Sequence, residues 1–244
     1  MRLRYILDDA AEASWNMAVD EALLVAGGAP TLRLYGWSPH AVSLGWFQRA
    51  ADFDDLPAGT TIVRRLTGGG AIHHGDEITF ALTADTHVLP RDIEASYRLL
   101  HEAAIAALSH LGVHGRLCDV GDLPGARPAE RWCFGSPGRN DVVTGAGKLL
   151  GSAQRRIAQP RPRVLHHGSI VLQRPSLTPF VAAAADEQPA DAAFADALRR
   201  QLVERIAAGL GLEPEAGSLS PEERGLADRL RGERYRNPAF LRRR

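Results

Sequence analysis

Short β-like runs alternate with a few helical segments along most of the chain, and this order constrains the fold more than any other feature. Runs of β-branched and aromatic residues bounded by Gly and Pro predict strands, at Thr31 to Tyr35, Ala41 to Leu44, Thr60 to Val63, Ile78 to Thr83, Asp141 to Val143, Lys148 to Arg155 and Ser169 to Leu172. Apolar periodicity predicts helices, at Ser14 to Val25 with Ser14 as N-cap, Glu94 to Leu111, Ala190 to Leu210 and Pro221 to Arg234. The interleaved order predicts an α+β or α/β fold with a helical C-terminal end.

Two composition changes predict the domain organisation. The stretch Asp119 to Gly138 is rich in Pro and Gly, which indicates a long loop, and such loops are often functional. After Pro175 the chain becomes rich in Ala, Glu, Leu and Arg, with an acidic link at Glu213 to Ser220. We expect residues 1–180 to form the main domain and residues 181–244 a helical extension packed on it.

Charge and cysteine content exclude several classes of protein. With 29 basic and 29 acidic side chains the formal net charge is zero, which argues against a general nucleic-acid binder. No stretch approaches the roughly 18 consecutive apolar residues of a membrane span, and the N-terminus lacks the apolar core of a secretory signal. The only cysteines are Cys118 and Cys133, which favours a reducing compartment. We therefore expect a cytoplasmic protein that binds neither nucleic acid nor membrane.

Lys148 is the only lysine, although the chain contains 29 basic residues. Lysine offers a compact point charge where arginine offers a wide planar fork, so its retention at one position indicates a specific role. Strict alternation from residue 148 would place Lys148, Leu150, Ser152 and Gln154 on one face of a strand. That face could line a polar pocket, or it could be a solvent-facing edge.

Three consecutive glycines lie within Arg64 to His74 (RRLTGGGAIHH). Without side chains, Gly68 to Gly70 let backbone N–H groups approach a ligand, and Arg64 and Arg65 add charge that suits a phosphate or carboxylate. No Gly-Lys-Ser/Thr follows, so this is not a Walker loop. A flexible hairpin is the alternative interpretation.

Cys133 and the paired histidines are further candidates for chemistry. Cys133 lies in a Gly- and Pro-rich stretch beside Arg131, whose positive charge would favour a thiolate nucleophile. Cys118 has no such neighbour, and we expect it to be structural. The pairs at His73 and at His166 lack recognisable ligand spacing, and adjacent histidines point to opposite faces of a strand, so we expect no metal site.

Four segments together resemble the biotin/lipoate protein ligase and octanoyltransferase superfamily. They are Asn16 to Ala22 (NMAVDEA), Arg64 to His74, Lys148 to Arg155 (KLLGSAQR) and His167 to Ser169 (HGS), in order and at suitable spacings within residues 1–175. The resemblance implies a mixed, largely antiparallel sheet flanked by helices, with an apolar slot for an acyl chain. It places Lys148 at the acyl carbonyl, where positive charge stabilises the developing oxyanion. It implies that Gly68 to Gly70 wall the slot and that His74 and His167 shape it. The full set of residues expected to bind the substrate is Arg64, Arg65, Gly68, Gly69, Gly70, Ala71, His74, Gly151, Ser152, Ala153 and His167.

Two mechanisms occur in this superfamily. Octanoyltransferases that use a cysteine take octanoyl from acyl carrier protein, and one branch has the nucleophile in a Cys-Phe-x-Ser-Pro stretch, here Cys133 to Pro137. The resemblance then implies no cofactor, and as acceptor a lysine of a lipoyl domain or of glycine cleavage H protein. Lipoate ligases instead use ATP and Mg²⁺, and they usually carry an accessory domain for which the residues after about 175 look too few and too helical.

Some residues depart from the transferase pattern. The position after His74 is Gly75 rather than the Asp often found in the family, and Gly138 to Asp141 looks more like a ligase. The turn at Gln159 to Arg163 is unusually Pro-rich, so the family pattern does not define the edge of the substrate channel here. A third interpretation is a degenerate member that only binds an acyl ligand or an acceptor.

Overall fold

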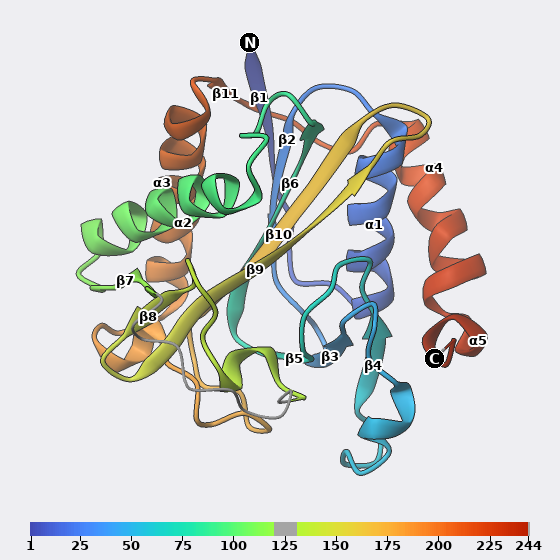
Figure 1. Ribbon diagram of the computed structural model, residues 1–244, viewed down its shortest axis with the longest axis horizontal. Helices are drawn as coiled ribbons and strands as arrows, with labels where there is room; N and C mark the ends of the chain where they lie inside the picture. The colour runs from blue at the N-terminus through green and yellow to red at the C-terminus, as the bar shows by residue number, and fades with distance from the viewer. Residues whose placement is uncertain (120–130, 244) are drawn as a thin grey trace.

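A computed structural model describes residues 1–119 and 131–243, and its framework is an eight-stranded sheet (Figure 1). The strands are arranged in the order β11-β1-β2-β6-β10-β9-β8-β7. Their bounds are β1 Arg2–Leu7, β2 Thr31–Tyr35, β6 Glu77–Asp85, β7 Arg116–Leu117, β8 Val142–Thr144, β9 Gly147–Ile157, β10 Arg163–Val171 and β11 Glu213–Ala216. Strand β1 pairs in parallel with β2 and β11, and the other neighbours pair antiparallel.

A smaller three-stranded sheet carries the glycine-rich segment. Its order is β4-β3-β5, with β3 at Ala41–Leu44, β4 at Thr61–Arg64 and β5 at Ile72–His74. Strand β3 pairs in parallel with β4 and antiparallel with β5. The three glycines therefore lie in the connection from β4 to β5, at the end of the small sheet.

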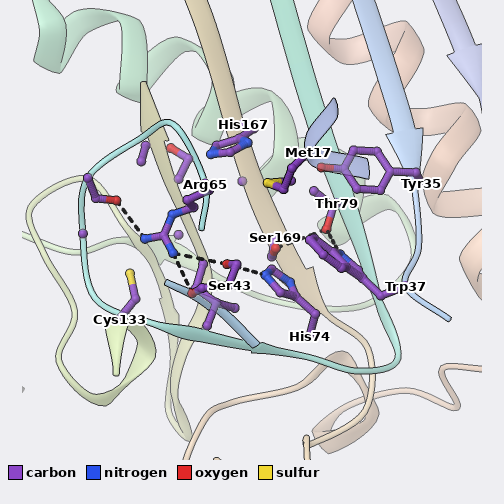
Figure 2. A pocket seen from close by; sticks show the side chains of 17 residues that line it. Met17, Tyr35, Trp37, Ser43, Arg65, His74, Thr79, Cys133, His167 and Ser169 are labelled. Atoms are coloured by element: carbon purple, nitrogen blue, oxygen red, sulfur yellow. Dashed lines mark hydrogen bonds between the residues drawn. The ribbon is translucent and has the colours of Figure 1, made fainter. Parts of the chain in front are cut away.

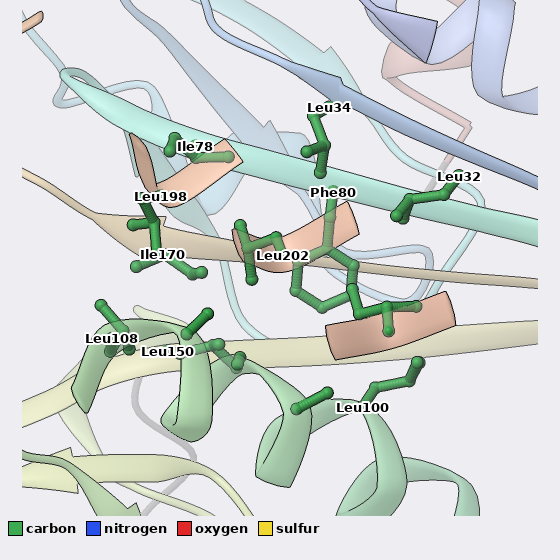
Figure 3. Close-up of a cluster of buried hydrophobic side chains, with 14 of the residues drawn as sticks. Leu32, Leu34, Ile78, Phe80, Leu100, Leu108, Leu150, Ile170, Leu198 and Leu202 are labelled. Carbon is green, nitrogen blue, oxygen red and sulfur yellow. The ribbon is translucent and has the colours of Figure 1, made fainter. Parts of the chain in front are cut away.

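Helices cover both faces of the large sheet (Figure 1). The bounds are α1 Ala13–Ala26, α2 Ile93–His110, α3 Ala192–Leu210, α4 Pro221–Leu230 and α5 Pro238–Leu241, with a π-helical turn at Arg231–Tyr235. Helices α2 and α3 pack over one face and form the main core with β2, β6, β9 and β10 (Figure 3). Helices α1 and α4 pack over the other face. None of the described helices is both long and apolar enough to cross a membrane.

Side chains alternate between these two faces, as strand geometry requires. On β10, His166 and Ile170 face α2, whereas Leu165, His167 and Ser169 face α1. All nine residues of β10 are buried, because helices cover both faces. The polar residues on the α1 face are available to build a site inside the protein.

The C-terminal residues pack on the same sheet and helices as the rest of the chain. Helix α3 packs against α2, β11 pairs with β1, and α4 packs on α1. The Arg64 guanidinium donates two hydrogen bonds to the carbonyl oxygen of Leu241, in α5. Residues 181–244 thus pack against α1, α2, β1 and β4 of the preceding part of the chain.

The expected α+β class is confirmed: the sheet is mixed, largely antiparallel and flanked by helices, and the C-terminal end is helical. Several element bounds were wrong. The N-cap of α1 is Glu12 rather than Ser14. Strand β10 begins at Arg163, inside the expected Pro-rich turn, and the expected acidic link contains β11. Of the expected loop from Asp119 to Gly138, residues 120–130 lie outside the described residues, and Cys133–Gly135 form a 3-10 turn.

Candidate active site

The structure places the single lysine beside the candidate nucleophile. Cys133 begins the 3-10 turn Cys133–Gly135, and Lys148 is the second residue of β9. The Lys148 Nζ lies 3.5 Å from the Cys133 Sγ and donates a hydrogen bond of 3.1 Å to the Cys133 carbonyl oxygen. Lys148 is 4% exposed, whereas Cys133 is partly exposed. A buried cation thus contacts a thiol that solvent can reach.

Asp141 holds the lysine in place. Its Oδ2 lies 2.7 Å from the Lys148 Nζ, and the ring centroid of Phe134 is 4.8 Å from the same atom. Burial alone lowers the pKa of Lys148, but the electrostatic and hydrogen-bond interactions with Cys133 and Asp141 outweigh it and raise the pKa above its ordinary value. Lys148 is therefore an ammonium at neutral pH.

The expected alternation along β9 was wrong at its start. The pairing with β8 shifts between Val142 and Val143, which inserts a bulge in β9. Leu149 and Leu150 consequently both lie in the main core. The Lys148 side chain lies against Gly151, and a Cβ on Gly151 would be only 2.3 Å from the Lys148 Cε. Gly151 therefore provides the space that the lysine side chain occupies.

The glycine turn and the cysteine turn are joined through their backbones. Ala71 donates its N–H to the carbonyl of Arg131 (2.7 Å), and Cys133 donates its N–H to the carbonyl of Ala71 (2.8 Å). A Cβ on Gly70 would lie 2.7 Å from the Cys133 nitrogen, closer than real Cβ atoms come. Gly69 has a φ of 92°, a conformation that glycine adopts without strain. The glycines thus allow the cysteine turn to approach closely.

The two arginines of the glycine-rich segment differ in position: Arg65 lines the slot, whereas Arg64 does not. Arg65 donates hydrogen bonds to the carbonyl oxygens of Gly68 and Gly70 (both 2.7 Å), and also to Ser43 and Thr67. All five of its N–H groups have partners, so it supports the turn.

Arg64 does not line the slot, and its role in binding the substrate stays a prediction. Its guanidinium donates hydrogen bonds to the carbonyl oxygens of Gly45, Trp46, Gln48 and Leu241.

A narrow slot extends from Cys133 into the protein, between the glycine turn and the α1 face of the large sheet (Figure 2). It encloses about 430 Å³ of space, including the part open to solvent. It is lined by Met17, Tyr35, Trp37, Ser43, Arg65, Gly68, Gly69, Ile72, His74, Thr79, Cys133, Gly151, Ser152, Ala153, His167, Gly168 and Ser169. The sulfur of Cys133 lies at one end, and Tyr35 and Trp37 lie toward the other (Figure 2). Gly70 and Ala71 do not line the slot but attach the cysteine turn beside it.

Both expected histidines line the slot, and both have their ring nitrogens bonded. His167 contacts Thr67 Oγ1 (2.7 Å) through Nε2 and Asp20 Oδ2 (3.2 Å) through Nδ1. His74 contacts Ser43 Oγ (2.7 Å) through Nε2 and Glu77 Oε1 (2.8 Å) through Nδ1.

Burial lowers the pKa of His74, although Glu77 acts in the opposite direction. Because both rings are engaged with protein groups, the slot presents mostly apolar atoms to a ligand, and an acyl chain is the ligand that such a slot suits.

Sequence reasoning missed Asp141 and the apolar end of the slot. Asp141 precedes β8, and its proximity to Lys148 follows from the pairing of β8 with β9, which the sequence spacing does not reveal. Met17, Tyr35 and Trp37 resemble ordinary core residues in the sequence. Within residues 1–119 and 131–243, no group of three His, Cys, Asp or Glu side chains could hold a metal ion.

The fold and the motif residues define an enzyme of the lipoyl ligase and transferase class. The chain belongs to the family described as lipoyl protein ligase A/B catalytic domain, which matches residues 12–216. It is similar to octanoyltransferase LipM of Kyrpidia tusciae, with 36% identity over 89% of this chain and 90% of that protein. It is also similar to octanoyltransferase LipM of Clostridioides difficile, with 28% identity over 99% and 98% of the two chains.

Two solved structures share the fold. One is lipoate-protein ligase A bound with ATP, with a TM-score of 0.78 and 22% identity over 99% of this chain and 98% of that one. The other is the bi-partite lipoate protein ligase of Thermoplasma acidophilum, with a TM-score of 0.75 and 23% identity over 99% and 96%. At such identities the likeness shows the fold alone.

Proposed function

We propose that this enzyme transfers an octanoyl group from octanoyl-acyl carrier protein, through a thioester on Cys133, to a lysine of a lipoyl-domain acceptor such as glycine cleavage H protein. The observation that supports this most directly is the 3.5 Å separation between the Lys148 Nζ and the Cys133 Sγ at the end of an apolar slot. The names of the relatives support the transfer of an octanoyl group. Lipoyl is the alternative acyl group.

The first step forms the enzyme thioester. The Cys133 thiolate attacks the carbonyl carbon of the donor thioester, and the electron pair of the C=O bond moves onto oxygen. Lys148 stabilises this oxyanion with its ammonium. Collapse of the intermediate breaks the bond to the carrier sulfur, which leaves as a thiolate and takes up a proton. The octanoyl chain lies in the slot during this step.

The second step forms the amide. The neutral amine of the acceptor lysine attacks the same carbonyl carbon, and Cys133 leaves as a thiolate. The nitrogen loses one proton to solvent. Attack on the donor thioester and then on the enzyme thioester divides the transfer into two easier steps. Since the donor is already a thioester, the reaction requires no ATP.

The cations at the slot favour this reaction over an ATP-dependent ligation. Lys148 is paired with Asp141, and all N–H groups of Arg65 are bound to protein oxygens. A triphosphate requires cations that can turn toward it. Neither of these two cations can do so without losing its partners. The ligase with ATP and Mg²⁺ is therefore the alternative that the experiment has to distinguish.

A side-by-side assay on one apo acceptor tests the proposal. One arm contains octanoyl carrier protein without ATP, and the other contains free lipoate with ATP and Mg²⁺. We expect transfer in the first arm, with a hydroxylamine-labile octanoyl adduct on Cys133 detected by mass spectrometry.

Cys118→Ser is the matched control and should keep the activity, whereas Cys133→Ser should lose it. Full activity of Cys133→Ser would contradict the mechanism. So would acylation of the acceptor only in the second arm, with release of pyrophosphate. Absence of any adduct or transfer would favour a protein that only binds acyl groups. The cytoplasmic location stays a prediction.

A further inference from the structure

A chain of buried hydrogen bonds lies on the α2 side of the large sheet and includes the hydroxyl of Ser152, a residue that also lines the slot. His166 Nε2 and His101 Nε2 each lie 2.7 Å from the hydroxyl oxygen of Ser152. His101 Nδ1 forms a short hydrogen bond with the carbonyl oxygen of Asn140. His101, in α2, and His166, in β10, are both fully buried. The chain therefore joins β10, β9 and α2 to the segment before β8.

Chemistry fixes the direction of each of these hydrogen bonds. A carbonyl oxygen only accepts, so the His101 Nδ1 carries a proton. Burial lowers the pKa of His101 and lowers that of His166 well below its ordinary value, so both rings are neutral. His101 Nε2 must then accept from the Ser152 hydroxyl. Ser152 in turn accepts from the His166 Nε2–H. Among the described residues, the buried His166 Nδ1 has no partner, which agrees with this assignment, because an unpaired acceptor there costs less than an unpaired N–H.

The carbonyl at the end of this chain belongs to the residue next to the lysine's partner. Asn140 has a φ of 66°, which non-glycine residues rarely adopt, and its N–H donates to the carbonyl of Cys118 (3.0 Å). The next residue, Asp141, directs its carboxylate to Lys148. The peptide between residues 140 and 141 therefore helps to set where that carboxylate lies, together with Gly138, whose N–H donates to Asp141 Oδ2 (2.6 Å) and whose carbonyl accepts the Asp141 N–H (3.1 Å).

We propose that His101 is a positioning residue, which holds the peptide after Asn140 so that Asp141 keeps Lys148 against Cys133. His101 contacts none of the reacting atoms and acts through a backbone carbonyl. The inference rests on the proposed function for its effect on the reaction, but its structural part can be measured without an acyl donor.

The test compares two substitutions that place an amide at different ends of the ring. Asn places its N–H₂ near the Nδ1 position, and Gln near the Nε2 position. His101→Asn can therefore keep the bond to Asn140, whereas His101→Gln cannot. His110→Gln, at an exposed position of the same helix, is the matched control. Because Lys148 is the only lysine, protein labelled with ¹⁵N-lysine gives one side-chain ammonium signal.

We expect His101→Gln to shift the ammonium signal and to slow acylation of Cys133 in a single turnover by about tenfold to a hundredfold, with the donor KM nearly unchanged. His101→Asn and His110→Gln should stay close to wild type in both measurements. Melting temperatures identify variants that lose activity by unfolding. Nitrogen-15 NMR of the wild-type histidines should find the proton of His101 on Nδ1 and that of His166 on Nε2.

Three results would overturn the proposal. The first is a folded His101→Gln protein with the wild-type lysine signal. The second is a His101→Asn protein that is folded but as impaired as His101→Gln. The third is a wild-type His101 protonated on Nε2 instead of Nδ1, a result that needs no variant. The lysine signal decides the positioning role even if the wild-type protein forms no octanoyl adduct, which would refute the proposed function alone.

Discussion

The ammonium of Lys148 lies 2.7 Å from a carboxylate oxygen of Asp141, and both side chains are buried. A buried charge is costly unless it is paired, and the pair keeps the lysine charged in a site that would otherwise favour the neutral amine. The same ammonium reaches the Cys133 sulfur. The predictions that follow concern this arrangement and the parts of the fold that support it.

Removing the ammonium should slow the chemical step. In Lys148→Met the oxyanion loses a charged donor, so we expect acylation of Cys133 to fall about a hundredfold to a thousandfold. Lys148→Arg keeps the charge but requires space for a wide fork where Gly151 already contacts the side chain, and it should be only partly active. Quenched-flow mass spectrometry of the octanoyl adduct measures both rates. A Lys148→Met protein with the wild-type rate would contradict the role of the ammonium.

Removing the carboxylate should make the lysine a competing nucleophile. Burial lowers the pKa of Lys148 and Asp141 raises it, so Asp141→Asn lowers the pKa. As the pH rises through this lower value, the amine loses its proton and can capture the octanoyl group from the adjacent Cys133.

Peptide mapping should therefore find a hydroxylamine-resistant octanoyl amide on Lys148 in Asp141→Asn, and more of it at higher pH. The wild-type protein, treated identically, should give only the labile adduct on Cys133. If the variant forms no amide across this pH range, Asp141 does not protect the lysine.

A methyl group on Gly70 should separate the two turns of the site. Its Cβ would lie 2.7 Å from the Cys133 nitrogen, so the cysteine turn must move. We expect Gly70→Ala to lower the free energy of unfolding by about 1–3 kcal/mol and to slow acylation. Gly68→Ala is the control, because its Cβ would meet the Phe47 ring at an ordinary 3.8 Å. Urea denaturation compares the two variants, and an equal loss of stability would refute the close approach. Adduct formation of Gly70→Ala is compared with that of the wild type, because Gly68 lines the slot.

The protein should lose stability in mild acid through His73. Burial lowers the pKa of His73 from 6.5 to about 4, and its Nδ1 accepts the N–H of Leu177 (3.2 Å). Between these two pH values the unfolded chain binds more protons than the folded one, so the free energy of unfolding decreases as the pH falls from about 6.5 toward 4.

His73→Asn offers an acceptor oxygen that does not titrate, and should give a weaker dependence on pH. Urea denaturation at pH 7 and pH 5 measures the difference between the two proteins. An equal loss of stability in both would show that other groups cause it.

The sequence could predict those parts of the fold that depend on local pattern. The strands Thr31–Tyr35 and Ala41–Leu44 have the predicted bounds, because Gly and Pro residues delimit short apolar runs. The start of β10 was missed because His166 and His167 look polar, although both are buried and form hydrogen bonds within the protein. Strand β11 was missed because its sequence is exposed and contains Pro, and its strand conformation depends on pairing with the distant β1.

The site was predictable as a set of motifs but not as a geometry. The segments around Cys133 and Lys148 indicated chemistry separately. Their contact depends on the bulge in β9, which places Lys148 on the other face of the strand from Leu150. A simple alternation of side chains along the strand does not predict this bulge. The positions of Asp141 and His101 depend on pairings between distant segments. Such long-range contacts leave no periodic signal in the sequence.

Strand β1 has one consequence for how the chain folds during synthesis. Arg2 lies opposite Glu213, so one edge of β1 has no partner strand until residues far along the sequence have left the ribosome. An unpaired edge can pair with the edge of another chain. This edge of the nascent protein must therefore stay away from other chains through most of translation. Dense polysomes or depleted chaperones should reduce the yield of folded enzyme, and the reduction should exceed that for a protein whose edge strands pair locally.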